Sequence, residues 1–129
     1  MKIFTIMGQN VGDIPSFYAE INSVFMAGED WALGQSLDAF HDMLCGGYGA
    51  ITGREPIRIV WKSIEHSRIA LGLETTRDFL RQKLHQPEIY NIELINSRLV
   101  ELDCGTGKTY FELILEIIAD HANIELVPA

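Results

Sequence analysis

Three short segments rich in β-branched and aromatic residues constrain the fold of this chain more than any other feature. They occupy residues 2–7, 57–61 and 124–127, and long stretches with helical patterns separate them. Such side chains favour strands, and strands that alternate with helices form parallel sheets. The sequence therefore predicts an α/β fold in which helices pack on a small three-stranded parallel sheet.

The length and composition of the chain fit one domain. It has 129 residues, of which 47% are hydrophobic and 22% charged. A chain of this size buries enough surface to fold without disulfides or metals, and this composition is typical of packed globular proteins. We therefore expect residues 1–129 to form a single domain that needs no metal and no cofactor.

The chain shows no sequence feature of export or membrane insertion. Its apolar runs are short, and the first expected strand follows Lys2 directly without a signal-peptide pattern. Cys45 and Cys104 are too few for a disulfide framework. We interpret them as free thiols in a reducing compartment, with a single bridge as the alternative, and we expect a cytoplasmic protein that does not bind membranes.

Helices are expected between the strands. Apolar residues at helical spacing follow each of several residues whose side chains commonly cap helix starts. The expected starts are Asp13, Ser36, Ser63, Thr75 or Thr76, and Thr109. The last of these forms a capping box with Glu112, in which the hydroxyl and the carboxylate each satisfy a free backbone N–H.

Residues 89–104 fit two structures. Ile92, Leu94 and Leu99 alternate as in a β-hairpin, whereas Ile92, Ile95 and Leu99 have the spacing of one helical face. We expect a helix in this segment and keep the hairpin as the alternative.

Acidic residues are concentrated towards both ends of the chain. Residues 1–50 hold one base and six acids, residues 84–129 hold two bases and eight acids, and residues 51–83 carry a net charge of +3, giving −8 in total. An acidic chain repels phosphate backbones, so direct nucleic-acid binding is not expected. A localised negative patch attracts a basic partner, although acidic surfaces also simply keep proteins soluble.

Asp38 and Asp42 are the most informative acidic pair. They stand four residues apart near the start of the helix that follows Ser36, so their carboxylates project from one helix face. The N-terminal helix dipole stabilises the charge of Asp38. The pair predicts a binding surface for cations of a partner, and a solvated face without a partner is the alternative.

Two further motifs carry weaker signals. Gly105–Thr109 is similar to the end of a phosphate-binding loop, but Leu102 stands where such a loop needs its first glycine. A turn before a capped helix is therefore expected there. His41 and Cys45 have a spacing that can chelate a metal, but the other histidines are scattered in sequence and zinc needs three or four ligands. We therefore expect no metal site.

The run from Gly34 to Leu44, followed by Gly46, resembles the signature helix of the barstar family of ribonuclease inhibitors. That family reads Gly, two polar residues, Leu-Asp-Ala, two mostly aromatic or apolar residues, Asp, and then x-Leu. A strand ending in Trp61 and a closing helix and strand follow in the same order. The resemblance covers about residues 2–72 and 106–127, and residues 73–105 look like an insertion relative to the compact members.

The resemblance implies a barstar-like fold and an intracellular inhibitor rather than an enzyme. In the family, the acidic helix and the loop before it block the active site of a small secreted ribonuclease, where carboxylates replace substrate phosphates. By position, Asp42 corresponds to the acid that enters the catalytic site, Asp38 to its supporting acid and Glu116 to a third acidic contact. Gly34 and Gly46 correspond to backbone positions near the interface.

The sequence also departs from the family pattern where binding aromatics are expected. Compact members place aromatic residues just before the glycine, whereas here Ala32 and Leu33 stand there and Trp31 comes one position earlier. His41 occupies the position before the second acid, Asp42. Trp31, Leu33 and His41 complete the expected contact set. The alternative functions are an immunity-like partner of another basic toxin or nuclease and, less favoured, a phosphate-binding protein that uses residues 105–109.

Overall fold

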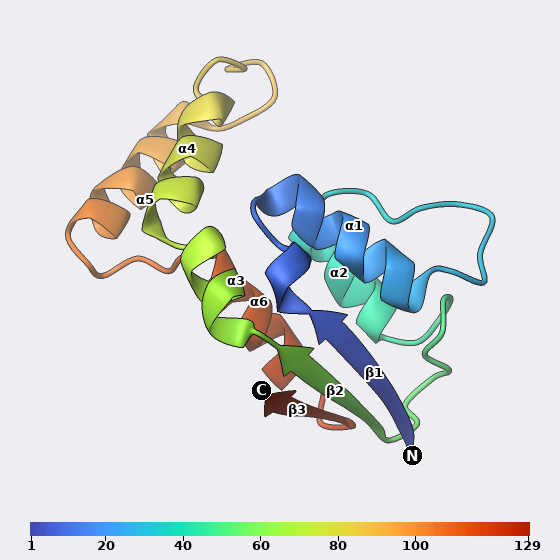
Figure 1. The fold of residues 1–129 in the computed structure, drawn as a ribbon. Coiled ribbons are helices and arrows are strands. Elements are labelled where there is room, and N and C mark those ends of the chain that lie inside the picture. The colour runs from blue at the N-terminus through green and yellow to red at the C-terminus, as the bar shows by residue number, and fades with distance from the viewer.

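The structure, a computed structural model, describes all 129 residues and confirms the α/β fold. The three strands lie where the sequence predicts them, and six α-helices and one short 3₁₀ helix connect them (Figure 1). In chain order the elements are β1 (Lys2–Met7), η1 (Gly8–Asn10), α1 (Ile14–Phe25), α2 (Leu37–Leu44), β2 (Ile57–Lys62), α3 (Ile64–Ala70), α4 (Leu73–Lys83), α5 (Ile92–Asp103), α6 (Tyr110–Ala119) and β3 (Ile124–Pro128).

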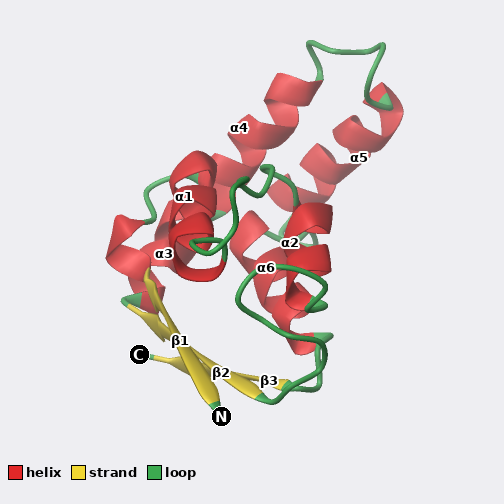
Figure 2. Ribbon diagram, turned by 90° about the vertical axis from the view of Figure 1, so that its right-hand side faces the viewer, coloured by secondary structure: helices red, strands yellow, loops and turns green.

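The sheet is parallel throughout, with the strand order β1-β2-β3. The strands form one layer and the helices lie on one side of it (Figure 2). Side chains alternate across the pleat, so Ile6 and Trp61, which are opposite each other in the register, are both buried beneath the helices. On the other face, Arg58 and Glu125 form an exposed ion pair of 2.9 Å between β2 and β3.

Aromatic side chains dominate the core between the sheet and the helices. Phe17 of α1 lies 5.6 Å from Phe40 of α2 and 6.1 Å from Trp61 of β2, measured between ring centroids. Trp61 also contacts Phe111 of α6 edge-on, and its indole N–H donates to Ser67 at 3.0 Å. These contacts fix α1, α2 and α6 against the same sheet face.

The predicted caps of three helices are confirmed. Asp13 and Ser16 form a capping box at α1, and the Ser36 hydroxyl accepts the Ala39 N–H at 3.0 Å at the start of α2. At α6, Thr109 and Glu112 exchange both bonds of the predicted capping box. The local sequence therefore determines where the helices that build the core begin.

Two predicted helix starts are wrong in detail. Ser63 precedes α3 but adopts a left-handed backbone with φ of 51°, and its side chain makes no capping bond. The next helix, α4, begins at Leu73 after Gly72 rather than at Thr75 or Thr76. The two threonine hydroxyls instead donate to preceding carbonyl groups, at 2.6 Å and 2.7 Å, as hydroxyls inside helices often do.

Within residues 89–104, Ile92–Asp103 form a helix, α5, and the alternative hairpin is excluded. It pairs with α4 to make a helical hairpin that extends away from the sheet (Figure 1). Leu80, Ile95 and Leu102 are the buried residues of a separate small core between the two helices, and Arg77 bonds Asp103 across them at 2.8 Å. Both cysteines are free and exposed, so the expectation of free thiols is confirmed.

Candidate functional site

The exposed face of α2 carries the two acids singled out from the sequence. Three apolar side chains of this helix, Phe40, Met43 and Leu44, are fully buried and anchor it to the core. Asp38 and Asp42 therefore point to solvent from successive turns, as the spacing predicts. The helix has only eight residues, so this anchoring, rather than intrinsic helix propensity, holds the two carboxylates in place.

Neither of these acids is neutralised by a lysine or an arginine. The structure has six ion pairs, and the only one that includes either residue joins His41 Nδ1 to Asp42 Oδ1 at 3.9 Å. The side chain of Asp42 is 72% exposed. Two carboxylates on one anchored helix face, without a lysine or arginine partner, can accept hydrogen bonds from cationic groups of another molecule.

Trp31 and Tyr48 form an aromatic pair beside α2. Their ring centroids lie 4.8 Å apart in an edge-on arrangement, and Trp31 remains 45% exposed. Tyr48 comes from the loop after α2, and its hydroxyl approaches the Ala39 carbonyl at 3.5 Å. Its pKa is raised by burial and by the nearby charges of Asp42 and Cys45. Tyr48 was not predicted as a site residue from the sequence. An aromatic residue in a glycine-rich loop directly after the acidic helix could have indicated a surface contact residue.

Side chains from neighbouring elements hold the loop before α2. Asn22 of α1 accepts the Leu33 N–H at 2.6 Å and donates to the Leu33 carbonyl at 3.3 Å. Glu29 accepts the N–H of Gly49 at 3.0 Å and so joins the loops on both sides of α2. Leu33 is only 5% exposed, which makes its side chain part of the core and leaves the exposed Gly34 beside it on the surface.

Gly46 ends α2 with a tight turn that no larger residue fits. Its φ is +84°, and a Cβ there would lie 2.2 Å from the Gly53 carbonyl oxygen. The Gly46 carbonyl accepts the Gly53 N–H at 2.9 Å, which closes the following loop. Gly46 therefore shapes the surface that carries Tyr48 and Asp42 through its backbone.

Glu116 differs from the two acids of α2. It lies on the exposed side of α6, a helix that contacts α2, but its carboxylate forms an ion pair with Lys108. A partner would have to compete with Lys108 for this carboxylate. The structure thus brings Trp31, Gly34, Asp38, His41, Asp42 and Gly46 into the surface around α2, buries Leu33 below it, and gives Glu116 an internal partner.

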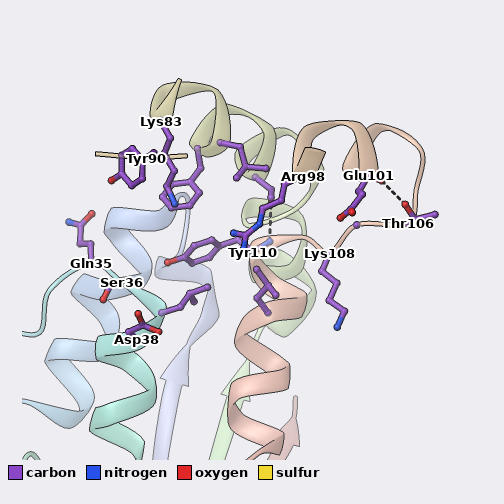
Figure 3. A pocket seen from close by; sticks show the side chains of 16 residues that line it. Gln35, Ser36, Asp38, Lys83, Tyr90, Arg98, Glu101, Thr106, Lys108 and Tyr110 are labelled. Atoms are coloured by element: carbon purple, nitrogen blue, oxygen red, sulfur yellow. Dashed lines mark hydrogen bonds between the residues drawn. The ribbon is translucent and has the colours of Figure 1, made fainter. Parts of the chain in front are cut away.

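A cleft of about 800 Å³ adjoins this surface where the α4–α5 hairpin meets α2 and α6. Ser36 and Asp38 lie on one side of it, while Lys83 and Arg98 lie on the other (Figure 3). Lys83 Nζ stands over the Phe79 ring at 4.3 Å, and burial together with Arg98 lowers the pKa of Lys83. The cleft therefore places cations of the hairpin opposite the acidic start of α2.

The segment Gly105–Thr109 does not have the setting of a phosphate-binding loop. Such a loop follows a strand, whereas this segment follows the helix α5. Lys108, which would contact a phosphate, is paired with Glu116. The expected turn before a capped helix is therefore what the structure contains.

The histidines are less scattered than the sequence suggests. His121, which follows α6, lies with its ring centroid 4.8 Å from that of His41. Its Nε2 is 3.6 Å from Cys45 Sγ. His121 is remote from His41 and Cys45 in sequence, but the packing of α6 on α2 brings it beside them as a third potential ligand.

Comparison with known families identifies the chain. The model of the Barstar family, described as barnase inhibitor, matches residues 1–86, and the chain belongs to this family. The matched range covers β1 through α4 and so reaches into the segment 73–105. Comparisons with curated proteins and with solved structures gave no match. None of the helices is both long and apolar enough to cross a membrane.

Proposed function

We propose that this protein inhibits a ribonuclease by binding its basic active site with α2 and the loop before it. The observation that carries the proposal is the pair of exposed carboxylates, Asp38 and Asp42, on one anchored helix face without a lysine or arginine partner. The family match supports it, since that family is described by the inhibition of the ribonuclease barnase.

The chemistry of a ribonuclease active site suits these two carboxylates. Such a site uses arginine, lysine or histidine to hold the negatively charged phosphates of RNA, and carboxylates accept hydrogen bonds from the same cations. In the proposed complex, Asp42 takes the place of one substrate phosphate and Asp38 supports it from the preceding turn. Both acids remain hydrated in the free protein, so the partner's cations supply the pairing that the isolated chain lacks.

The aromatic pair supplies the apolar part of the proposed interface. Tryptophan and tyrosine are enriched among the residues that dominate binding energies, because they bury a large area at a low cost in side-chain entropy. Trp31 is exposed yet held against Tyr48, so little of its freedom remains to be lost on binding. We infer that Trp31 packs beside the active site while the carboxylates enter it.

The charge of the whole chain favours association with a basic protein. The net charge is −8, and a complementary field accelerates the encounter of two proteins and makes the rate sensitive to salt. The proposed partner is a small basic ribonuclease of the secreted type or a related nuclease toxin. The inhibitor itself has no enzymatic role in this scheme and acts in the cytoplasm, where it protects the cell.

An immunity-like partner of a different basic toxin is the second candidate function. The observation that favours it is the altered set of side chains beside the acids, with His41 before Asp42 and a Trp31–Tyr48 pair in place of aromatics just before Gly34. Those residues contact the parts of a partner that surround the active site. A changed set is expected where the partner has changed.

Inhibition of a small basic ribonuclease by the wild type, Asp42→Ala and Asp78→Ala tests the proposal. Asp78 is a matched control, because it is also exposed, lies in a helix and has no ion-pair partner. We expect Asp42→Ala to weaken inhibition by about 2–5 kcal/mol, or about thirtyfold or more, and Asp78→Ala to leave it nearly unchanged. Equal inhibition by both variants would contradict the proposal. Binding to the nuclease without inhibition would favour the immunity-like alternative.

A further inference from the structure

Three potential metal ligands converge where α2 packs against the end of α6. Their ligand atoms all lie within 4.8 Å of one another, although His121 is remote in sequence from the other two residues, His41 and Cys45. Cys45 Sγ is 3.8 Å from His41 Nδ1 and 3.6 Å from His121 Nε2. We propose that His41, Cys45 and His121 form a binding site for Zn²⁺.

Two of the three distances between ligand atoms approach what a tetrahedral zinc ion requires. With Zn–S near 2.3 Å and Zn–N near 2.0–2.1 Å, neighbouring ligand atoms of a tetrahedron lie about 3.3–3.6 Å apart. The two sulfur–nitrogen distances, 3.6 Å and 3.8 Å, are close to this range without any ion present. Small side-chain rotations would bring all three ligands onto one ion.

A backbone hydrogen bond orients His121 for this role. Its Nδ1 lies 2.9 Å from the carbonyl oxygen of Ile117, one turn earlier in α6. A carbonyl oxygen only accepts, so Nδ1 carries the proton and Nε2 keeps its lone pair towards Cys45. Histidines that bind metals commonly hold their second nitrogen in this way.

The α2 helix supplies the other two ligands at a chelating spacing. His41 and Cys45 are four residues apart and lie on the same face, and Cys45 is the residue that follows the last turn. Asp42 Oδ1 lies 3.9 Å from His41 Nδ1, so a carboxylate adds negative potential next to the ligands. Because Cys45 is exposed, water or a group of a partner can complete the coordination.

The donor set favours zinc over copper. Two imidazoles and one thiolate also hold copper in electron-transfer proteins, but there a methionine usually stands as a weak axial ligand. The methionine of α2, Met43, is fully buried in the hydrophobic core on the other side of the helix. Zinc needs no such axial ligand, and its open fourth position suits an exposed site.

Metal binding would connect two parts of the chain that are otherwise joined mainly by packing. The ion would fix the end of α2 to the residue that follows α6, beside the acids of the proposed inhibitory surface. The inference does not depend on the proposed function, because the ligands come from this chain alone. A metal titration therefore tests it without any nuclease.

Titration of the full chain with Co²⁺ and then Zn²⁺, under a phosphine reductant, tests the site. We expect one Co²⁺ per chain, with the visible absorption of tetrahedral cobalt and a sulfur-to-cobalt charge-transfer band, and displacement by Zn²⁺. Cys45→Ser should abolish the charge-transfer band. His121→Ala should weaken binding at least about tenfold, because even second-shell changes around metal ligands have effects of 10–100-fold.

Cys104→Ser and His85→Ala are matched controls, since both residues are exposed and lie outside the cluster. Both should bind Co²⁺ as the wild type does, and circular dichroism of all four variants checks that they are folded. A wild-type chain that binds no Co²⁺, a spectrum unaffected by Cys45→Ser, or equal losses in the Cys104→Ser variant would overturn the proposal.

Discussion

The sheet region, which comprises the three strands and the helices that cover them, has a far larger buried core than the α4–α5 hairpin. Around the sheet, 21 buried residues form one continuous core that includes Phe17, Phe40 and Trp61. Between α4 and α5, only Leu80, Ile95 and Leu102 are buried in a cluster of their own. Apolar burial is the main favourable contribution to folding, so the hairpin depends far more on its attachment than the sheet region does.

The acids of α2 also differ from the Arg77–Asp103 pair of the hairpin in how their charges are satisfied. The acids of α2 face solvent without a lysine or arginine partner, whereas Arg77 and Asp103 bond to each other across the hairpin at 2.8 Å. Charges that pair with each other inside one chain are already engaged, while unpaired charges on a rigid face remain available to another molecule. Our proposal therefore places recognition on α2 of the sheet region and treats the hairpin as a bordering structure.

Buried polar contacts attach the hairpin to the sheet region. The N–H of Tyr110 at the start of α6 donates to the Thr76 hydroxyl of α4 at 2.8 Å. The Tyr110 and Tyr18 hydroxyls share a hydrogen bond of 2.6 Å that continues to α1. Phe79 of α4 packs edge-on against the Tyr110 ring. Tyr110 therefore contacts both regions and couples them through its backbone N–H, its hydroxyl and its ring.

The largest effect is expected from a cavity in the main core. Phe17 is fully buried and contacts the Phe40 and Trp61 rings, so Phe17→Ala should lower the free energy of unfolding by about 3–5 kcal/mol. Chemical denaturation followed by far-UV circular dichroism measures this loss. A loss below about 1 kcal/mol would contradict the assignment of most of the stability to this core.

A cavity in the hairpin should have a smaller and local effect. Leu102→Ala removes one of the three buried residues of that cluster and should cost about 2–3 kcal/mol, mainly by opening α4 and α5. Hydrogen exchange should become faster in residues 73–103 while the amides of β2 keep their protection. Equal acceleration in β2 would show that the two regions unfold together. It would contradict the separate stability of the hairpin and the sheet region.

The tyrosine pair gives the smallest predicted effect and a dependence on pH. Burial raises the pKa values of Tyr18 and Tyr110, with their mutual hydrogen bond adding to the rise at Tyr18. In the unfolded chain tyrosine loses its proton near pH 10, so above about that pH the unfolded state binds fewer protons than the native state and stability falls.

Tyr18→Phe should cost about 1–3 kcal/mol at neutral pH, because it leaves the buried Tyr110 hydroxyl without this partner. It should also reduce the alkaline loss of stability, since one of the two shifted groups is gone. Denaturation midpoints at pH 7 and at about pH 10.5 measure both effects. If the stability of Tyr18→Phe falls between pH 7 and about pH 10.5 as much as that of the wild type, the alkaline loss of stability does not come from the tyrosine pair.

Local patterns predicted the elements that build the sheet region. The strands are recognisable from their β-branched residues, and Asp13, Ser36 and Thr109 mark the starts of α1, α2 and α6 because their side chains bond the first free N–H groups. Residues 89–104 were ambiguous for a physical reason. Their apolar spacing fits two structures, and the packing of Ile95 and Leu102 against Leu80 selects the helix.

Contacts between remote residues explain what the sequence did not predict. His121 reaches His41 and Cys45 only because α6 packs on α2, and Leu33 is buried because Asn22 draws its backbone towards α1. The resemblance groups Glu116 with the acids of α2, whereas the fold pairs its carboxylate with Lys108. By contrast, the common face of Asp38 and Asp42 follows from helical spacing alone and was predicted correctly.

Competition with a mononucleotide tests the central claim most directly. A 3′-mononucleotide places its phosphate in the active site of a small basic ribonuclease, where we expect Asp42 to bind. Calorimetric titration of the ribonuclease with this protein, without mononucleotide and at several mononucleotide concentrations, measures the apparent dissociation constant of the complex. Our proposal predicts that the apparent dissociation constant rises in proportion to the mononucleotide concentration. An unchanged constant would contradict it, because the protein would then bind outside the active site.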